Sequence, residues 1–135
     1  MKLRLLLILA ALLALPQHAT ARLDVVATLP TYGAIAEAIG GDKVKVTSLA
    51  RGTEDAHFVD AKPSFIRVLN RADVLIEGGA GLEVGWLPPV VNNARNRHIL
   101  RGGKGRVVLR TGIKMLEIPI GQLSRAQGDV HAFGN

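Results

Sequence analysis

From residue 22 onward, short apolar segments typical of strands alternate with amphipathic segments typical of helices. This alternation constrains the fold most, because it is the pattern of parallel strands joined by crossover helices. The sequence therefore predicts an α/β fold, with a parallel sheet of about four strands flanked by helices. The expected strands are residues 24–29, 44–48, 74–77, 106–110 and 115–118, and the expected helices are residues 32–39, 63–69 and 82–95.

Several of these segments carry further signals. Residues 24–29 are too continuously apolar for an edge strand, so we expect them inside the sheet. An apolar stripe with helical spacing runs through residues 32–39 and ends at a Gly-Gly pair. Pro63 suits the first position of the next helix, and the prolines at 88 and 89 predict that the third helix is kinked or begins afresh.

The N-terminus has the three parts of a secretory signal peptide. Lys2 and Arg4 precede an unbroken apolar run at residues 5–15, and Ala19-Thr20-Ala21 supplies a small-residue cleavage site. The run is too short for a transmembrane helix, which needs about 20 residues, so a buried core helix or a membrane anchor is the less favoured alternative. We expect residues 1–21 to be a signal peptide and residues 22–135 to be the mature lobe, exported to the periplasm.

Charge and cysteine content exclude several classes of protein. Loss of Lys2 and Arg4 with the signal peptide leaves 15 of the 17 cations against 11 acids, a net charge of +4, which is not typical of nucleic-acid binding. With no cysteine, the chain has no disulfide scaffold, zinc finger or iron–sulfur site. It also lacks the residue that a lipoprotein signal modifies, so we expect a soluble product with no lipid anchor.

His57 is the principal candidate ligand. It lies in a polar connection, residues 50–62, after the second expected strand. Ligands bind at the carboxyl ends of strands in open α/β sheets, and neutral imidazole is the commonest metal-binding side chain. A solvated surface histidine is the alternative.

The other histidines are weaker candidates. His131 has Asp129 two residues away, a carboxylate able to orient an imidazole, and is the second candidate ligand. His98 lies among arginines that would oppose a metal ion, so we expect it on a solvated surface. His18 leaves with the signal peptide.

A basic stretch at residues 95–114 suggests an alternative function. It lacks the aromatic residues that stack on bases, and is read as a solvated connection or as a contact for anions or a membrane surface. No dinucleotide fingerprint, P-loop or nucleophile elbow is present, and a hydrolase using His57, Glu54 and Asp60 would lack a second ligand and a base, so we expect no enzyme. The seven cations are Arg95, Arg97, Arg101, Lys104, Arg106, Arg110 and Lys114.

Five sequence segments in register give the chain a family resemblance. Together they resemble the zinc and manganese solute-binding proteins of ABC importers, the metal-binding cluster A-I family, over the mature chain but only over the N-terminal half of such a protein. The segments are residues 24–28, 54–57, 62–64 with 70–76, 81–88, and 128–131 with 134–135.

The resemblance implies a fold, a function and partners. Family members have two α/β lobes joined by a long helix, bind one metal ion between them, and deliver it to a membrane permease. It implies capture of zinc, or less strongly manganese, by a protein that is monomeric at full length and has no nucleic-acid partner. The alternative remains a secreted module that binds anions or surfaces through residues 95–114.

The resemblance also implies particular ligands. His57 matches the first family ligand, which typically follows Asp-Pro; here Asp55-Ala56 precedes it, which is expected to loosen the turn. The second family ligand is usually the histidine of an Asn-Pro-His segment, and Asn135 falls two residues short of it. His131 belongs to the preceding segment and is only a candidate substitute. The remaining ligands would lie in a second lobe.

Overall fold

A four-stranded parallel sheet forms the centre of the computed structural model, which describes residues 21–116 and 133–134. The strand order is β2-β1-β3-β4, and every neighbouring pair is parallel. β1 is an inner strand, as its continuous apolar sequence predicts. The predicted α/β class is confirmed. The strands are β1 (Leu23–Ala27), β2 (Val44–Ser48), β3 (Val74–Glu77) and β4 (Arg106–Val108).

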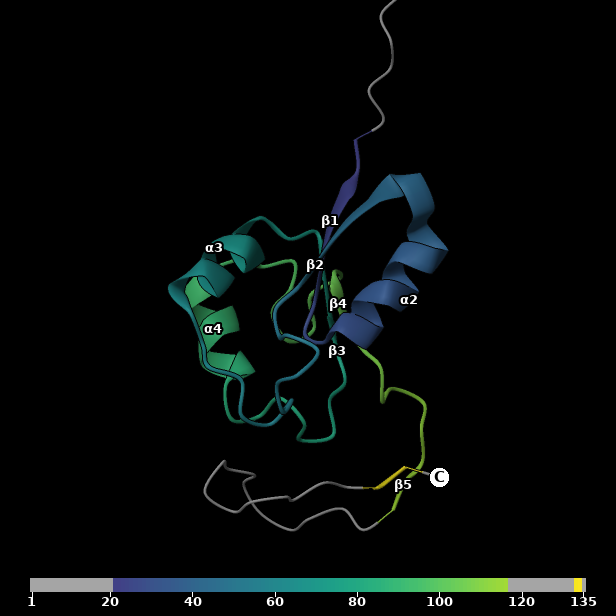
Figure 1. The fold of residues 1–135 in the computed structure, drawn as a ribbon, viewed down its shortest axis with the longest axis vertical. Coiled ribbons are helices and arrows are strands. Elements are labelled where there is room, and N and C mark those ends of the chain that lie inside the picture. Colours follow the sequence, from purple (N-terminus) through teal and green to yellow (C-terminus); the bar gives the residue numbers. More distant parts are fainter. Residues whose placement is uncertain (1–20, 117–132, 135) are drawn as a thin grey trace, which may run out of the picture.

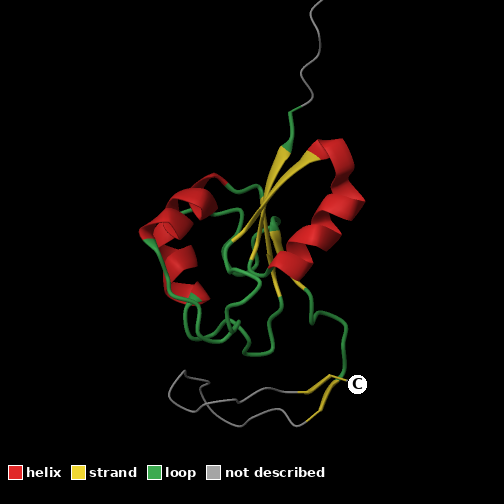
Figure 2. Ribbon diagram, in the orientation of Figure 1, coloured by secondary structure: helices red, strands yellow, loops and turns green. Residues whose placement is uncertain are grey.

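Helices cover both faces of this sheet (Figures 1 and 2). Helix α2 (Pro30–Gly40) lies on one face, and α3 (Pro63–Arg71) and α4 (Leu87–Ala94) lie together on the other. Each begins with proline in its first turn, where the missing N–H costs nothing. The two prolines of α4 therefore start a new helix rather than kink a longer one. A short 3₁₀ turn, η1 (Gly41–Lys43), connects α2 to β2.

The hydrophobic core lies between the sheet and the α3–α4 pair. Val26 and Leu75 supply its sheet side. Asn96 is buried beside it and donates from Nδ2 to the carbonyl oxygens of Leu69 and Ala72 at the end of α3. No helix in the part of the chain that the structure describes is long and apolar enough to span a membrane. The helix side of the core consists of Phe65, Leu69, Trp86, Leu87, Val90, Val91 and Ala94.

Helix α2 packs on the sheet through small residues. A Cβ atom added to Gly33 would lie 2.5 Å from Ser48 Oγ, so a larger residue would require the Ser48 side chain or the helix to shift. The predicted helix is confirmed, but its apolar stripe is only partly buried, since Ile35 and Ile39 are 52% and 83% exposed. The close approach of the small residues leaves both isoleucines outside the contact.

The last described strands form a separate ribbon. β5 (Met115–Leu116) pairs antiparallel with β6 (Phe133–Gly134), not with the main sheet. The expected strand at 115–118 is confirmed at Met115 and Leu116, and its other two residues lie outside the described part of the chain. β6 was not predicted from the sequence. The expected signal peptide and His131 lie outside the described residues.

Candidate functional site

His57 lies in the loop that leaves the carboxyl end of β2, at the lower end of the sheet in Figure 1. The loop is anchored to β1 at its start, where the Leu49 and Ala50 amides donate to the carbonyls of Ala27 and Thr28 at 2.9 and 3.0 Å. At its far end Val59 is buried in the core, 1% exposed. Residues 51–58 therefore project from two fixed points, in the position predicted for a ligand-bearing loop.

Asp55 holds both the backbone and the ring of His57. Its Oδ1 accepts a hydrogen bond from the His57 amide at 2.9 Å and lies 2.7 Å from His57 Nδ1. An aspartate that binds the backbone two residues later is an Asx turn, which the Asp-x-His spacing favours. Because a carboxylate can only accept this hydrogen bond, Nδ1 carries the proton, and Nε2 is the nitrogen of the neutral ring that has a lone pair. The His57 side chain is 26% exposed.

Trp86 connects the same loop to the core. Its indole Nε1 donates to the Ala56 carbonyl oxygen at 2.9 Å. The indole is 2% exposed, and its ring centroid lies 6.2 Å from that of Phe65. The turn that alanine in place of proline is expected to loosen is thus held by Asp55 on one side and by Trp86 on the other.

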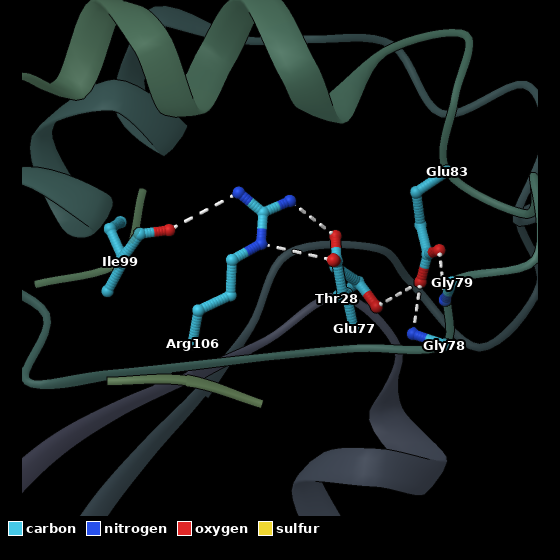
Figure 3. Close-up of polar contacts among 7 residues, drawn as sticks. All are labelled: Thr28, Glu77, Gly78, Gly79, Glu83, Ile99 and Arg106. Carbon is cyan, nitrogen blue, oxygen red and sulfur yellow. Dashed lines mark hydrogen bonds and ion pairs between the residues drawn. The ribbon is translucent and has the colours of Figure 1, made fainter. Parts of the chain in front are cut away.

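The loop after β3 is organised by a buried carboxylate (Figure 3). Glu83, 3% exposed, accepts hydrogen bonds from Thr28 Oγ1 at 2.7 Å and from the amides of Gly78 and Gly79 at 2.8 and 3.0 Å. Burial, and secondly the Glu83 charge, raise the pKa of Tyr32 above its ordinary value of about 10. Glu83 therefore ties the ends of β1 and β3 together, and its oxygens are occupied by protein donors.

One predicted surface cation is instead part of a buried ion pair. Arg106 donates from Nε and Nη2 to the two oxygens of Glu77 at 3.1 and 2.8 Å, and from Nη1 to the Ile99 carbonyl (Figure 3). Reading residues 95–114 as a solvated connection is therefore wrong for Arg106, because Glu77 lies opposite it on β3. The other six cations of the stretch are exposed, and so is His98, as predicted.

A cavity of about 900 Å³ opens at the carboxyl ends of β3 and β4. Its lining includes Glu83, Arg101, Arg106 and Arg110, and His57 does not contribute to it. The cavity and the imidazole are therefore separate features.

The described residues bring no complete metal site together. In residues 21–116 and 133–134, no group of three or more histidines, cysteines or carboxylates is placed to hold a metal ion. Glu54, considered for a hydrolase, instead accepts the Arg51 amide at 2.7 Å. Sequence reasoning missed the roles of Glu83 and Trp86, although both lie within the segment 81–88 that carries part of the resemblance.

The chain matches known proteins over most of its length. The family model of ZnuA, described as zinc-uptake complex component A, periplasmic, matches residues 25–133. The chain therefore belongs to this family, which is one of substrate-binding components of ABC importers and not of enzymes.

Curated relatives are similar at low identity. The metal ABC transporter substrate-binding lipoprotein ScbA of Streptococcus cristatus is 27% identical over 119 residues, which are 86% of this chain and 37% of the relative. The manganese ABC transporter substrate-binding lipoprotein PsaA of Streptococcus pneumoniae is 27% identical over 84% of this chain and 36% of its own length. The chain thus spans little more than a third of these relatives. Their names include lipoprotein, so the expectation of no lipid anchor is not supported.

Solved structures agree on the fold. A crystal structure of ZnuA is 26% identical with a TM-score of 0.53, covering 71% of this chain and 35% of that one. The Mn-bound periplasmic metal binding protein from Candidatus Liberibacter asiaticus is 21% identical with a TM-score of 0.58, covering 73% and 34%. This second likeness bears on the fold alone.

Proposed function

We propose that this chain is one lobe of an extracytoplasmic protein that captures a divalent transition metal and delivers it to an ABC-type importer. The observation that carries the proposal is the Asp55–His57 pair at the carboxyl end of β2, with 2.7 Å between the carboxylate and Nδ1. A carboxylate on the second ring nitrogen is the usual support of a metal-binding histidine. Membership of a metal-uptake family supports the same assignment.

The metal would be shared with residues beyond the described ones. His57 supplies one ligand through Nε2, and His131 is the candidate second ligand. A closed zinc site has four protein ligands, so the remaining ones would come from a second lobe that follows this one. The lobe by itself is therefore expected to bind metal weakly.

We propose zinc ahead of manganese as the cargo. The matching family model is described as a zinc-uptake component, whereas PsaA of Streptococcus pneumoniae is named for manganese. Imidazole-rich sites favour zinc and carboxylate-rich sites favour manganese, so the ligands outside this lobe decide between them.

The rest of the assignment follows from this role. Residues 1–21 would be the cleaved signal peptide, and residues 22–135 the N-terminal lobe of a monomeric protein in the periplasm. Its partner would be the importer's membrane permease. The anion-binding alternative is less favoured, because Arg106, one of the seven cations of residues 95–114, is paired with Glu77.

The test compares two histidines in the two-lobed protein, produced by extending the chain through its downstream coding sequence. Calorimetric zinc and manganese titrations would be run on the unaltered protein, on His57→Ala and on the control His98→Ala, whose side chain is exposed. Loss of a ligand costs more than the 10–100-fold typical of supporting residues, so we expect His57→Ala to lower zinc affinity at least about 100-fold. Equal affinities in the two variants would contradict the assignment.

A further inference from the structure

The peptide unit between Ala56 and His57 is held at both ends. Its oxygen accepts the hydrogen bond from Trp86 Nε1 at 2.9 Å, and its N–H donates to Asp55 Oδ1 at 2.9 Å. A peptide unit is planar, so bonds to its oxygen and its nitrogen fix the orientation of the whole plane. That orientation sets the direction in which the His57 side chain leaves the backbone.

The hydrogen bonds from the His57 amide to Asp55 and from Trp86 to the Ala56 carbonyl oxygen constrain the turn in different ways. Asp55 belongs to the same loop as His57, so its hydrogen bond to the His57 amide shapes the turn itself. Trp86 lies 30 residues further along the chain and is part of the hydrophobic core. The Trp86 bond therefore sets where the turn sits relative to the sheet.

The donor itself is rigidly placed. The planes of the Trp86 and Phe65 rings are tilted by 59° to each other, and aromatic pairs favour such tilted arrangements over face-to-face stacking. The Trp86 backbone amide donates to the Glu83 carbonyl at 3.3 Å, and the Glu83 side chain is fixed by Thr28 and two glycine amides. The indole N–H thus connects the His57 loop to a buried network that spans the ends of β1 and β3.

We propose that Trp86 is a positioning residue for metal binding, which holds the Ala56–His57 peptide so that the His57 ring is presented in one orientation. The inference rests on the proposed function in one respect, that His57 is a ligand. Trp86 contacts no metal in this arrangement. By holding this peptide, Trp86 reduces the conformational entropy that the His57 side chain loses when it binds a metal ion.

Two variants separate the hydrogen bond from the packing. Trp86→Phe removes the indole N–H and keeps an aromatic ring against Phe65. Phe65→Leu disturbs the packing of the same indole but keeps its N–H, and serves as the matched control. Both are expected to lower the free energy of unfolding, so the change in stability alone does not discriminate between them.

The discriminating measurements are made by NMR on the chain, with zinc chloride as the probe. We expect Trp86→Phe to raise the zinc concentration for half-response of the His57 ring signals about tenfold, the lower range for residues that support a ligand. It should also speed hydrogen exchange of the His57 amide without metal. Phe65→Leu should leave the zinc response within about twofold, because the indole N–H remains.

Each outcome decides a separate point. An unchanged response in Trp86→Phe, or equal shifts in both variants, would overturn the positioning role. His57→Ala, which has no imidazole to observe, is followed alongside through the backbone amide signals of residues 51–58: if it removes their zinc response while Trp86→Phe does not alter that response, only the present inference fails. A zinc response of the same amide signals that survives His57→Ala would overturn the ligand assignment and the inference with it.

Discussion

Two loops at the carboxyl edge of the sheet are built in opposite ways. The loop after β2, residues 51–58, is largely exposed, and its glutamate, Glu54, bonds to an amide three residues away. The loop after β3, residues 78–86, is mostly half-buried, and its buried glutamate, Glu83, accepts a hydrogen bond from Thr28, 55 residues away in the sequence. The first presents an imidazole, and the second supplies the framework against which that imidazole is held.

In this lobe, the residue that stabilises the fold and the proposed metal ligand lie in different loops. Glu83 is satisfied by protein donors and has little capacity left for a ligand. The His57 amide and Nδ1 bond to Asp55 in the same turn, and the turn is joined to Trp86 through the Ala56 carbonyl oxygen. Substitutions of Glu83 should therefore mainly change the free energy of unfolding, whereas substitutions of Asp55 and His57 should mainly change metal binding.

The largest expected effect is on stability. Glu83→Ala would leave the Thr28 hydroxyl and two glycine amides without their buried acceptor, which should lower the free energy of unfolding by about 3 kcal/mol. Glu54→Ala, which removes an exposed acceptor from the other loop, should change it by less than about 0.5 kcal/mol. Urea denaturation of both variants measures the difference.

A milder variant covers the case in which Glu83→Ala does not fold. Thr28→Val removes one of the three donors and should cost about 1 kcal/mol. If Glu54→Ala and Thr28→Val lowered the free energy of unfolding equally, the two loops would not differ in their contribution to stability.

The second effect is on metal affinity. Asp55→Ala removes the acceptor of the His57 ring and amide protons, so zinc affinity should fall about 10–100-fold, with little change in stability because Asp55 is 58% exposed. The control is Asp60→Ala, because Asp60 is an exposed aspartate two residues beyond the loop. Calorimetry of the two-lobed protein measures both affinities. An equal loss in Asp60→Ala would indicate general electrostatic attraction rather than support of the ring.

The smallest effect is a pH dependence of the buried network. Burial and the Glu83 charge raise the pKa of Tyr32, so above pH 10 the unfolded chain releases this proton before the folded chain does. The free energy of unfolding should therefore fall as the pH rises above about 10, and less so in Tyr32→Phe. Because Tyr32 is the only tyrosine, tyrosinate absorbance in folded and urea-unfolded chain reports the shift directly. Coincident curves would show that neither burial nor the Glu83 charge raises the pKa of Tyr32 in the folded chain.

Much of the fold was predictable from local signals. A proline in the first turn marks the start of each α-helix in residues 21–116, namely α2, α3 and α4, and Gly78 and Gly79 mark the end of β3. The continuous apolar sequence of β1 predicts its inner position, because a strand covered on both faces has no polar side. The place of His57 after β2 followed from the same order of elements.

Features that depend on contacts distant in sequence were not predictable. Arg106 reads as one more surface cation until β3 places Glu77 beside it. The stripe of α2 predicts burial, but Gly33 brings the helix so close to the sheet that Ile35 and Ile39 lie outside the contact. The bond from Trp86 to Ala56 joins residues 30 positions apart, and no periodic pattern indicates it.

The most direct test of the account is the zinc response of the two described histidine rings in the unaltered chain. A zinc titration followed by ring-nitrogen NMR observes His57 and His98 in one sample, so solution conditions are the same for both. The account predicts a saturable change at Nε2 of His57, with Nδ1 remaining protonated and bonded to Asp55, and no comparable change at His98. Equal responses at the two rings, or coordination through Nδ1 of His57, would contradict it.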